Sequence, residues 1–511
     1  MTDEADRPGS PAPRPSLLRN RLSIIGLVPA VWGLTGFALF FLLDLAPGET
    51  RAYSAVNLIP SLAVVALGVL LIALGVLREA RRRRSGRGPS LERTLRVELG
   101  AAFFASLGAA TALVTLLMTT VGTTAANLYE ITESNTFCGE TCHSVMEPEW
   151  VAFQEGAHSR LDCVECHIGP KAPSRIAYKL NGLRQVALVA TGGYERPIPT
   201  PVKSLRPARE ICEHCHWSGR FIDYRESTRT HFLADEETTP FKVRMLTKVG
   251  GSTNGIGEGA GIHYHMVSTR KVEYVARDPQ RQKIPWVRVT LEDGRVTEYV
   301  DSDDPLDEAE RAQLELRTMD CLDCHNRPAH RFESPARAVD AAIAAGAISR
   351  KLPFVKARSV TALDGSYATG EEALAGIAVS LTEFYEDEHP DVLEEHRGDL
   401  EKSIEAVRKI YRRNFFPEMK ASWRAHPDNA GHLESPGCFR CHNDRMESEE
   451  GEQIKTDCNT CHLILAQGEN VRSISTDGTN GNRFFHPDDD DYLDEYTDCT
   501  DCHTGGADLY E

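Results

Sequence analysis

All fourteen cysteines of the chain fall into seven pairs, and a histidine directly follows each pair. Six pairs read Cys-x-x-Cys-His, whereas the first, in FCGETCHSVM, has three residues between its cysteines. We number the motifs in chain order: Cys138/Cys142/His143, Cys163/Cys166/His167, Cys212/Cys215/His216, Cys321/Cys324/His325, Cys438/Cys441/His442, Cys458/Cys461/His462 and Cys499/Cys502/His503. No cysteine is left over for any other chemistry.

Cys-x-x-Cys-His is the attachment signature of c-type haem. Two thiols form thioethers with the haem vinyl groups, and the adjacent imidazole becomes an axial ligand of the iron. Disulfides would not need a histidine after every second cysteine, and structural zinc does not call for seven histidines in the same register. The motifs therefore predict seven covalently bound haem c groups, held by the cysteines and ligated by the seven motif histidines.

The remaining histidines decide whether each iron is closed. A haem with two histidine ligands is an electron carrier, whereas an open sixth position can bind a substrate. Eleven histidines lie outside the motif positions, enough to close every site. We expect His214, His389 and His396 to be bystanders and rank His231 below the best candidates. By their nearness to haem-binding segments, the candidate distal ligands are His158, His263, His265, His330, His426, His432 and His486.

Three apolar stretches predict a membrane anchor. Residues 22–43, 52–77 and 99–129 contain no charged residue, and each exceeds the roughly 20 residues that cross a bilayer as a helix. A cleavable signal peptide is the alternative for the first stretch, but no Ala-x-Ala pattern follows it. We therefore expect three transmembrane helices within residues 1–130.

Charge predicts the orientation and the partners. Arginines crowd the N-terminal segment and the loop at 78–96, which the positive-inside rule places in the cytoplasm. Everything after the third helix then lies in the periplasm, the side on which c-type haem is attached. Residues 1–130 hold 13 basic and 9 acidic residues, and the remaining 44 basic and 66 acidic residues give a net charge of −22. This excess favours basic soluble partners over nucleic acid, with the acidic run at 488–491 as the candidate docking patch.

The spacing of the motifs predicts the organisation of the chain. We expect a mainly α protein: a three-helix anchor, then a periplasmic multihaem domain with little secondary structure and a small β-hairpin insertion. The hairpin is predicted in WVRVTLEDGRVTEYV and helices in 333–417. The expected divisions are an anchor at 1–130, motifs 1 to 3 at 131–217, the hairpin insertion at 218–320, motif 4 with the helices at 321–425, and motifs 5 to 7 at 426–511.

One run of the sequence is similar to a known family. The stretch FCGETCHSVMEPEWVAFQEGAHSRLDCVECHIGP, which follows an apolar segment, resembles the NapC/NirT family of membrane-anchored cytochromes. The complete layout, including CLDCHNRPAH, resembles the ImcH-type inner-membrane cytochromes. The resemblance implies a quinol dehydrogenase that oxidises menaquinol from the membrane pool and reduces periplasmic c-type cytochromes in anaerobic or extracellular respiration.

The resemblance also assigns residues at the start of the path. It implies that His158 is a distal ligand and that Lys179 binds quinol, with an interfacial lysine touching lipid headgroups as the alternative. Glu147 is a carboxylate close to motif 1 that could accept protons. The longer spacing of motif 1 leaves two candidate iron ligands, His143 and Met146.

Two other functions stay open at this point. A terminal reductase of a small oxyanion or nitrogen compound would need an open iron. A membrane scaffold or redox sensor would need a signalling element that we do not recognise in the sequence. The sequence does not predict an oligomeric state.

Overall fold

The computed structural model describes two compact units, Met1–Ser134 and Asn135–Glu511. The described residues are 16–18, 20–44, 51–86, 113, 117, 120–124, 127–141, 143–168, 172–201, 206–217, 224–250, 261–267, 269–469, 471, 481–487 and 499–510. Each unit is considered by itself below. The five-part division expected from the sequence stays a prediction, since the contacts within the chain separate only these two units.

The first unit contains two long apolar helices, α1 (Arg21–Asp44) and α2 (Arg51–Arg84). By length and composition, the segments Arg21–Ala38 and Ser61–Arg84 could each cross a membrane. Most of their large apolar side chains face outward, as expected for helices in lipid. The third predicted span, 99–129, lies almost entirely outside the described residues, so it stays a prediction.

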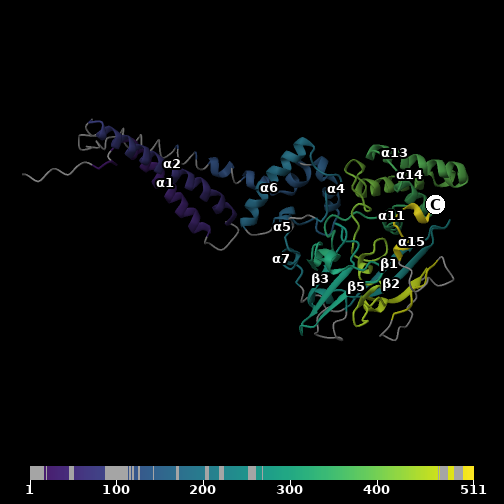
Figure 1. Ribbon diagram of the computed structural model, residues 1–511. Coiled ribbons are helices and arrows are strands. Elements are labelled where there is room, and N and C mark those ends of the chain that lie inside the picture. Colours follow the sequence, from purple (N-terminus) through teal and green to yellow (C-terminus); the bar gives the residue numbers. More distant parts are fainter. Residues whose placement is uncertain are drawn as a thin grey trace, which may run out of the picture. The chain divides into compact units, whose positions relative to one another are not determined.

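Glycines allow α1 and α2 to approach closely (Figure 1). A Cβ atom at Gly26 would lie 2.8 Å from the carbonyl oxygen of Gly68, and one at Gly68 would lie 2.5 Å from the backbone nitrogen of Ala30. Small residues are typical of helix–helix contacts in membranes, where backbone packing replaces the hydrophobic effect. The glycine contact therefore identifies the packed faces of α1 and α2.

The second unit combines short helices, two sheets and a helical layer. The helices before the insertion are π-helix η1 (Phe137–Thr141), α4 (His143–Gln154), α5 (Cys163–His167), α6 (Ala172–Thr191), α7 (Ala208–Cys212), α8 (Tyr264–Val267), α9 (Glu308–Arg311) and α10 (Cys321–Cys324). The later ones are α11 (Pro335–Ala344), α12 (Val355–Leu363), α13 (Gly370–Glu388), α14 (Pro390–Asn414), the 3₁₀ turns η3 (Pro417–Met419), η4 (Gly437–Arg440), η5 (Cys458–Thr460) and η6 (Ala507–Leu509), and α15 (Cys499–Cys502). Figure 1 shows α13 and α14 on one side of this unit and the strands on the other.

The helices predicted within 333–417 form, and they build the largest apolar core described. Apolar residues recur along α11 to α14 at helical spacing, and those on the inner faces, such as Leu363, Ile377 and Val407, are fully buried. Phe232 at the end of β1 joins this core. The helical insertion is thus packed onto the strand layer and does not fold as an isolated bundle.

The strands form two antiparallel sheets. They are β1 (Tyr224–Phe232), β2 (Pro240–Lys248), β3 (Thr269–Val275), β4 (Trp286–Leu291), β5 (Val296–Asp301), β6 (Arg317–Thr318), β7 (Met446–Ser448) and β8 (His462–Gly468). The predicted hairpin is β4–β5, with Thr290 opposite Val296 and Gly294 at φ +89° in its turn. It lies inside a five-stranded sheet of order β6-β3-β4-β5-β7, and a second sheet has the order β1-β2-β8. The β content is therefore larger than the small hairpin that the sequence predicted.

Candidate haem-binding sites

The cysteine motifs occupy single helical turns. In motifs 3, 4 and 7 the backbone N–H of the histidine donates to the backbone carbonyl oxygen of the first cysteine. The N···O distances are 2.7 Å, 2.8 Å and 2.8 Å respectively. Such a turn brings residues three apart to one side. Two thiols and the following imidazole are thereby presented together, which is the arrangement that thioether attachment requires.

Motif 1 accommodates its additional residue in a different turn. Cys138 lies in the π-helix η1, whose wider turn holds more residues than an α-helical one. Cys142 and the side chain of His143 lie outside the described residues. Met146 follows in α4, and its side chain is half-buried.

The described motif cysteines differ in burial. Cys215, Cys458 and Cys502 are exposed, whereas the other described motif cysteines are half-buried. Helix α7 ends at Cys212, so Cys215 lies in the turn after it, with its N–H 3.1 Å from the carbonyl oxygen of Cys212. Attachment of haem through these cysteines stays a prediction.

A second histidine faces the motif histidine at six of the seven motifs. The ring centres are 5.8 to 6.4 Å apart in every pair. The pairs are His158–His216, His167–His330, His263–His325, His265–His442, His432–His462 and His486–His503.

This separation fits one iron between two imidazoles. A metal–nitrogen bond to imidazole is about 2 Å long and the ring centre lies about 1 Å behind the nitrogen, so two opposed ligands place their centres roughly 6 Å apart. The donor set also fits, since two thiols and two imidazoles are what a c-type haem takes from a protein. The described residues thus fit haem at motifs 2 to 7.

Backbone carbonyls orient five of these imidazoles. Because a carbonyl oxygen only accepts, Nδ1 must carry the proton, and Nε2 is left with its lone pair for a metal. The Nδ1 atoms lie at 3.0 Å from Pro328 O for His158, 2.8 Å from Val249 O for His263, 3.3 Å from Ile262 O for His265, 2.9 Å from Glu149 O for His330 and 2.5 Å from Lys455 O for His442.

Burial favours the metal-binding form of several rings. It lowers the pKa of His167, His265, His325 and His462 below the ordinary histidine value. Nearby histidines lower it further, and a neutral imidazole is the form that binds a metal.

Thiols of successive motifs lie close together in the first half of the second unit. The thiols of Cys138 and Cys163 are hydrogen-bonded, which raises the pKa of Cys163 and joins motifs 1 and 2. Burial raises the pKa of Cys166, with Glu165 and the Cys215 thiol of motif 3 adding to the effect. The Cys212 thiol of motif 3 is hydrogen-bonded to the Cys321 thiol of motif 4, which raises the pKa of Cys212. This contact joins motifs 3 and 4.

The same order continues to the C-terminus. Burial raises the pKa of Cys324 to about 12, and nearby Cys438 of motif 5 adds to the effect. Burial likewise raises the pKa of Cys461 of motif 6 to about 11, again with Cys438 as a neighbour. His432, which faces the motif 6 histidine, has its Nδ1 3.9 Å from the Sγ of Cys499 in motif 7. Each motif therefore neighbours the next motif along the chain.

The other predicted site residues are placed as follows. His426 is 4% exposed, its Nδ1 is 3.2 Å from Thr200 Oγ1, and its ring stacks on Phe332. Burial, with Arg327 nearby, lowers the pKa of His426 to about 4. Within the described part of the chain, no motif histidine faces it. Glu147 is exposed on α4, and Lys179 lies in α6 with its side chain outside the described residues.

The expected bystander histidines have partners of other kinds. His231, ranked below the candidates, contacts Asp340 with 3.3 Å between Nδ1 and Oδ2. His389 packs against Phe384, and His396 lies 3.3 Å from Asp399. His214 is exposed.

Sequence reasoning missed two kinds of residue. The carbonyl groups that orient the imidazoles leave no trace in residue type, so no sequence signal reveals them. Asp323 and Arg440, charged residues within motifs 4 and 5, are buried at 3% and 8% exposure. A charge between two motif cysteines was the visible signal, although surface exposure would have been the ordinary expectation.

Two membrane-length helices joined to successive cysteine–histidine turns define a membrane-anchored multihaem c-type cytochrome. The chain is 38% identical over 495 residues to "Cytochrome c-type protein ImcH" of Geobacter sulfurreducens, a match covering 96% of each chain. It belongs to the family of ImcH-like cytochromes. No family model matches the chain, and no solved structure matches it.

Proposed function

We propose that the chain is a heptahaem quinol dehydrogenase of the bacterial inner membrane. It oxidises menaquinol and transfers electrons to periplasmic c-type cytochromes in anaerobic or extracellular respiration. The N-terminus is cytoplasmic and the second unit is periplasmic. The similarity to ImcH supports a redox electron-transfer role, and the two apolar helices support attachment to the membrane.

The facing histidine pairs carry the proposal. Haem bound at the motifs would supply reversible one-electron chemistry. Paired imidazoles at motifs 2 to 7 would close both axial positions there, which suits transfer and not substrate binding. This disfavours the terminal-reductase alternative at these six motifs.

The order of the motifs supports a single route through the second unit. Motif 1 follows the apolar N-terminal region, and each later motif neighbours the one before it. Electrons from the membrane would then enter at motif 1 and leave at the far end of the series. The acidic run at 488–491 ends eight positions before Cys499 of motif 7, which supports a basic cytochrome as acceptor there.

Motif 1 is the proposed site of quinol oxidation. Its π-helical turn differs from the turns of the other motifs, and His143 or Met146 would hold the iron of a haem bound there. In this proposal the Lys179 ammonium group donates a hydrogen bond to a quinol oxygen. The quinol would give up its two electrons one at a time to the haem of motif 1 and its two protons to the periplasm, with the Glu147 carboxylate, which is exposed on α4, accepting a proton on the way.

Quinol-dependent reduction of two variants tests the assignment. Purified oxidised protein is mixed anaerobically with a menaquinol analogue, and the haem absorption bands are followed in wild type, Lys179→Ala and Glu147→Gln. We expect at least a tenfold slower reduction for Lys179→Ala and a smaller slowing for Glu147→Gln.

Lys171→Ala is the matched control, because it removes the same charge from the same segment of the sequence. Dithionite should reduce all forms equally. Equal quinol rates in wild type and Lys179→Ala would remove Lys179 from the quinol site, and a similar loss in Lys171→Ala would indicate a general effect of charge.

A further inference from the structure

Motifs 4 and 5 carry opposite charges at the same position. Asp323 and Arg440 each immediately precede the second cysteine of their motif. Both are buried, although the helical insertion at 333–417 separates the two motifs in sequence. Burial of a charge is costly unless it is paired and hydrogen-bonded, so the partners of these residues are informative.

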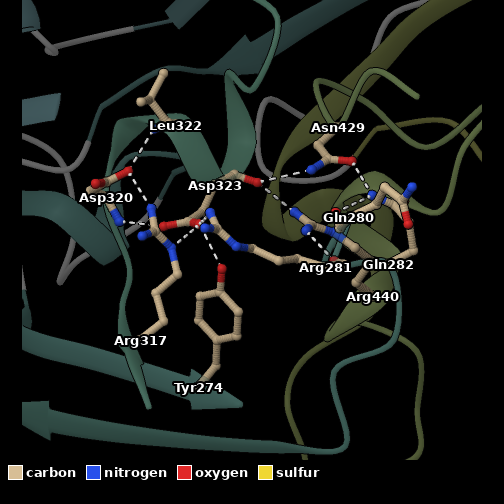
Figure 2. A network of polar contacts seen from close by, with 10 residues as sticks. All are labelled: Tyr274, Gln280, Arg281, Gln282, Arg317, Asp320, Leu322, Asp323, Asn429 and Arg440. Carbon is tan, nitrogen blue, oxygen red and sulfur yellow. Dashed lines mark hydrogen bonds and ion pairs between the residues drawn. The ribbon is translucent and has the colours of Figure 1, made fainter. Parts of the chain in front are cut away.

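The Asp323 carboxylate lies in a complete set of donors. Figure 2 shows Tyr274, Arg281 and Arg317 converging on it. The Oδ1 atom accepts from Tyr274 Oη at 2.6 Å, Arg317 Nε at 2.7 Å and Arg281 Nη1 at 3.2 Å. Its Oδ2 atom accepts from the backbone N–H of Asp320 at 2.7 Å, which closes the helical turn of motif 4.

The backbone of motif 4 is bonded directly to the side chain of motif 5. Arg440 Nη2 donates to the carbonyl oxygen of Asp323 at 2.6 Å, and Asn429 Nδ2 donates to the same oxygen at 3.3 Å. Arg440 Nη1 donates to the carbonyl of Arg281 at 2.8 Å (Figure 2). Arg281 thus bonds the Asp323 carboxylate through its side chain and Arg440 through its backbone.

The two motifs are also joined on their histidine side. His263 faces His325 of motif 4, and His265 faces His442 of motif 5. These two facing histidines are only two residues apart, at the start of α8. One short segment therefore faces both motifs, in addition to the contact that Asp323 and Arg440 make.

We propose that Asp323 and Arg440 are positioning residues that hold motifs 4 and 5 as one rigid electron-transfer pair. They do so together with the His263–His265 segment, and the inference rests on haem attachment under the proposed function. The pair joins the motifs before the helical insertion to those after it. Asp323 additionally contributes negative charge beside motif 4, and charge and hydrogen bonding near a haem are determinants of its reduction potential.

Spectroelectrochemical titration of the full-length protein tests the charge contribution. Asp323→Asn keeps a side chain of the same shape but removes the negative charge that favours the oxidised haem. We expect the midpoint potential that changes most to rise by about 59 mV. This shift corresponds to a tenfold change in the equilibrium constant of a one-electron couple. Glu273→Gln is the matched control, since Glu273 is a buried carboxylate, paired with Lys271 and Arg288, at the strand position before Tyr274.

Arg440→Lys tests the positioning contribution separately. It keeps the charge but lacks the rigid fork with which the Arg440 guanidinium donates to the carbonyls of Asp323 and Arg281. We expect the electron paramagnetic resonance signals of two haems to change together and the reduction of the last three haems to slow at least threefold. Unchanged potentials in Asp323→Asn, or an equal shift in Glu273→Gln, would overturn the charge contribution. Unchanged spectra and rates in Arg440→Lys would overturn the proposal that Arg440 holds motifs 4 and 5 together.

Haem content separates this inference from the proposed function. If wild type carries fewer than seven haems, or dithionite but not quinol reduces it, the proposed function fails. If wild type carries seven haems and is reduced by quinol, and both variants match it in spectra, potentials and rates, the roles proposed for Asp323 and Arg440 fail and the proposed function stands.

Discussion

The pairing of His330 with His167 makes a prediction that sequence order contradicts. His330 lies five residues after His325 of motif 4, but its ring faces His167 of motif 2 at 6.2 Å. Its Nδ1 is 2.9 Å from the carbonyl oxygen of Glu149, which leaves the other nitrogen with its lone pair for a metal. Removing the imidazole should therefore open the iron of motif 2 and leave motif 4 closed.

The expected size follows from the number of motifs. His330→Ala opens one iron of seven, so about one seventh of the haem becomes high-spin, and the reduced protein binds one more carbon monoxide than wild type. Magnetic circular dichroism and carbon monoxide titration measure the two quantities. His396→Ala, at a histidine that contacts Asp399, should change neither.

Double variants identify the iron. Two substitutions at one iron are not additive, whereas substitutions at separate irons are. His330→Ala combined with His167→Ala should still open one haem, and His330→Ala combined with His325→Ala should open two. The reverse result would assign His330 to motif 4 and refute the crossed pairing.

Two further predictions concern stability. Lys356 Nζ lies 2.8 Å from Asp340 Oδ1, and both side chains are over nine-tenths buried. Asp340→Ala leaves the Lys356 cation buried without this partner, so it should lower the free energy of unfolding by about 3–5 kcal/mol. Thermal unfolding of the detergent-solubilised protein checks this, and a double replacement by apolar residues that retained the same loss would contradict it. Gly68→Leu should separate α1 from α2, because its first side-chain atom would lie 2.5 Å from the backbone of Ala30. The amount of Gly68→Leu protein in the membrane, measured by immunoblot, should fall severalfold. Gly182→Leu is the control and should accumulate normally, because a side chain at Gly182 meets open space. Equal accumulation of the two variants would refute the close packing of α1 and α2.

Local patterns predicted much of the fold. Alternation around Asp293 and Gly294 predicts the β4–β5 hairpin, because two strands and their turn are contiguous in sequence. Helical periodicity predicts the insertion at 333–417 for the same reason. The pairing of β2 with β8 could not be predicted, since it joins residues over two hundred positions apart and depends on the complete fold.

The candidate site divides in a similar way. The cysteines and motif histidines follow from the chemistry of attachment, which requires them to be adjacent in sequence. The facing histidines do not follow in this way: His158 precedes motif 2 but faces His216 of motif 3. Any histidine within reach can serve an iron, and only the chain path decides which one does. His426 resembles the other candidates in sequence, and its ring packs on Phe332, so its role as a ligand stays a prediction.

The most direct test of the account is anaerobic reduction of the oxidised wild-type protein by a menaquinol analogue in detergent or liposomes. We expect the haems to be reduced rapidly, as followed by their absorption bands, with one quinol consumed for every two haems reduced. Reduction by dithionite but not by quinol would contradict it, and electrons would then have to enter from a protein partner.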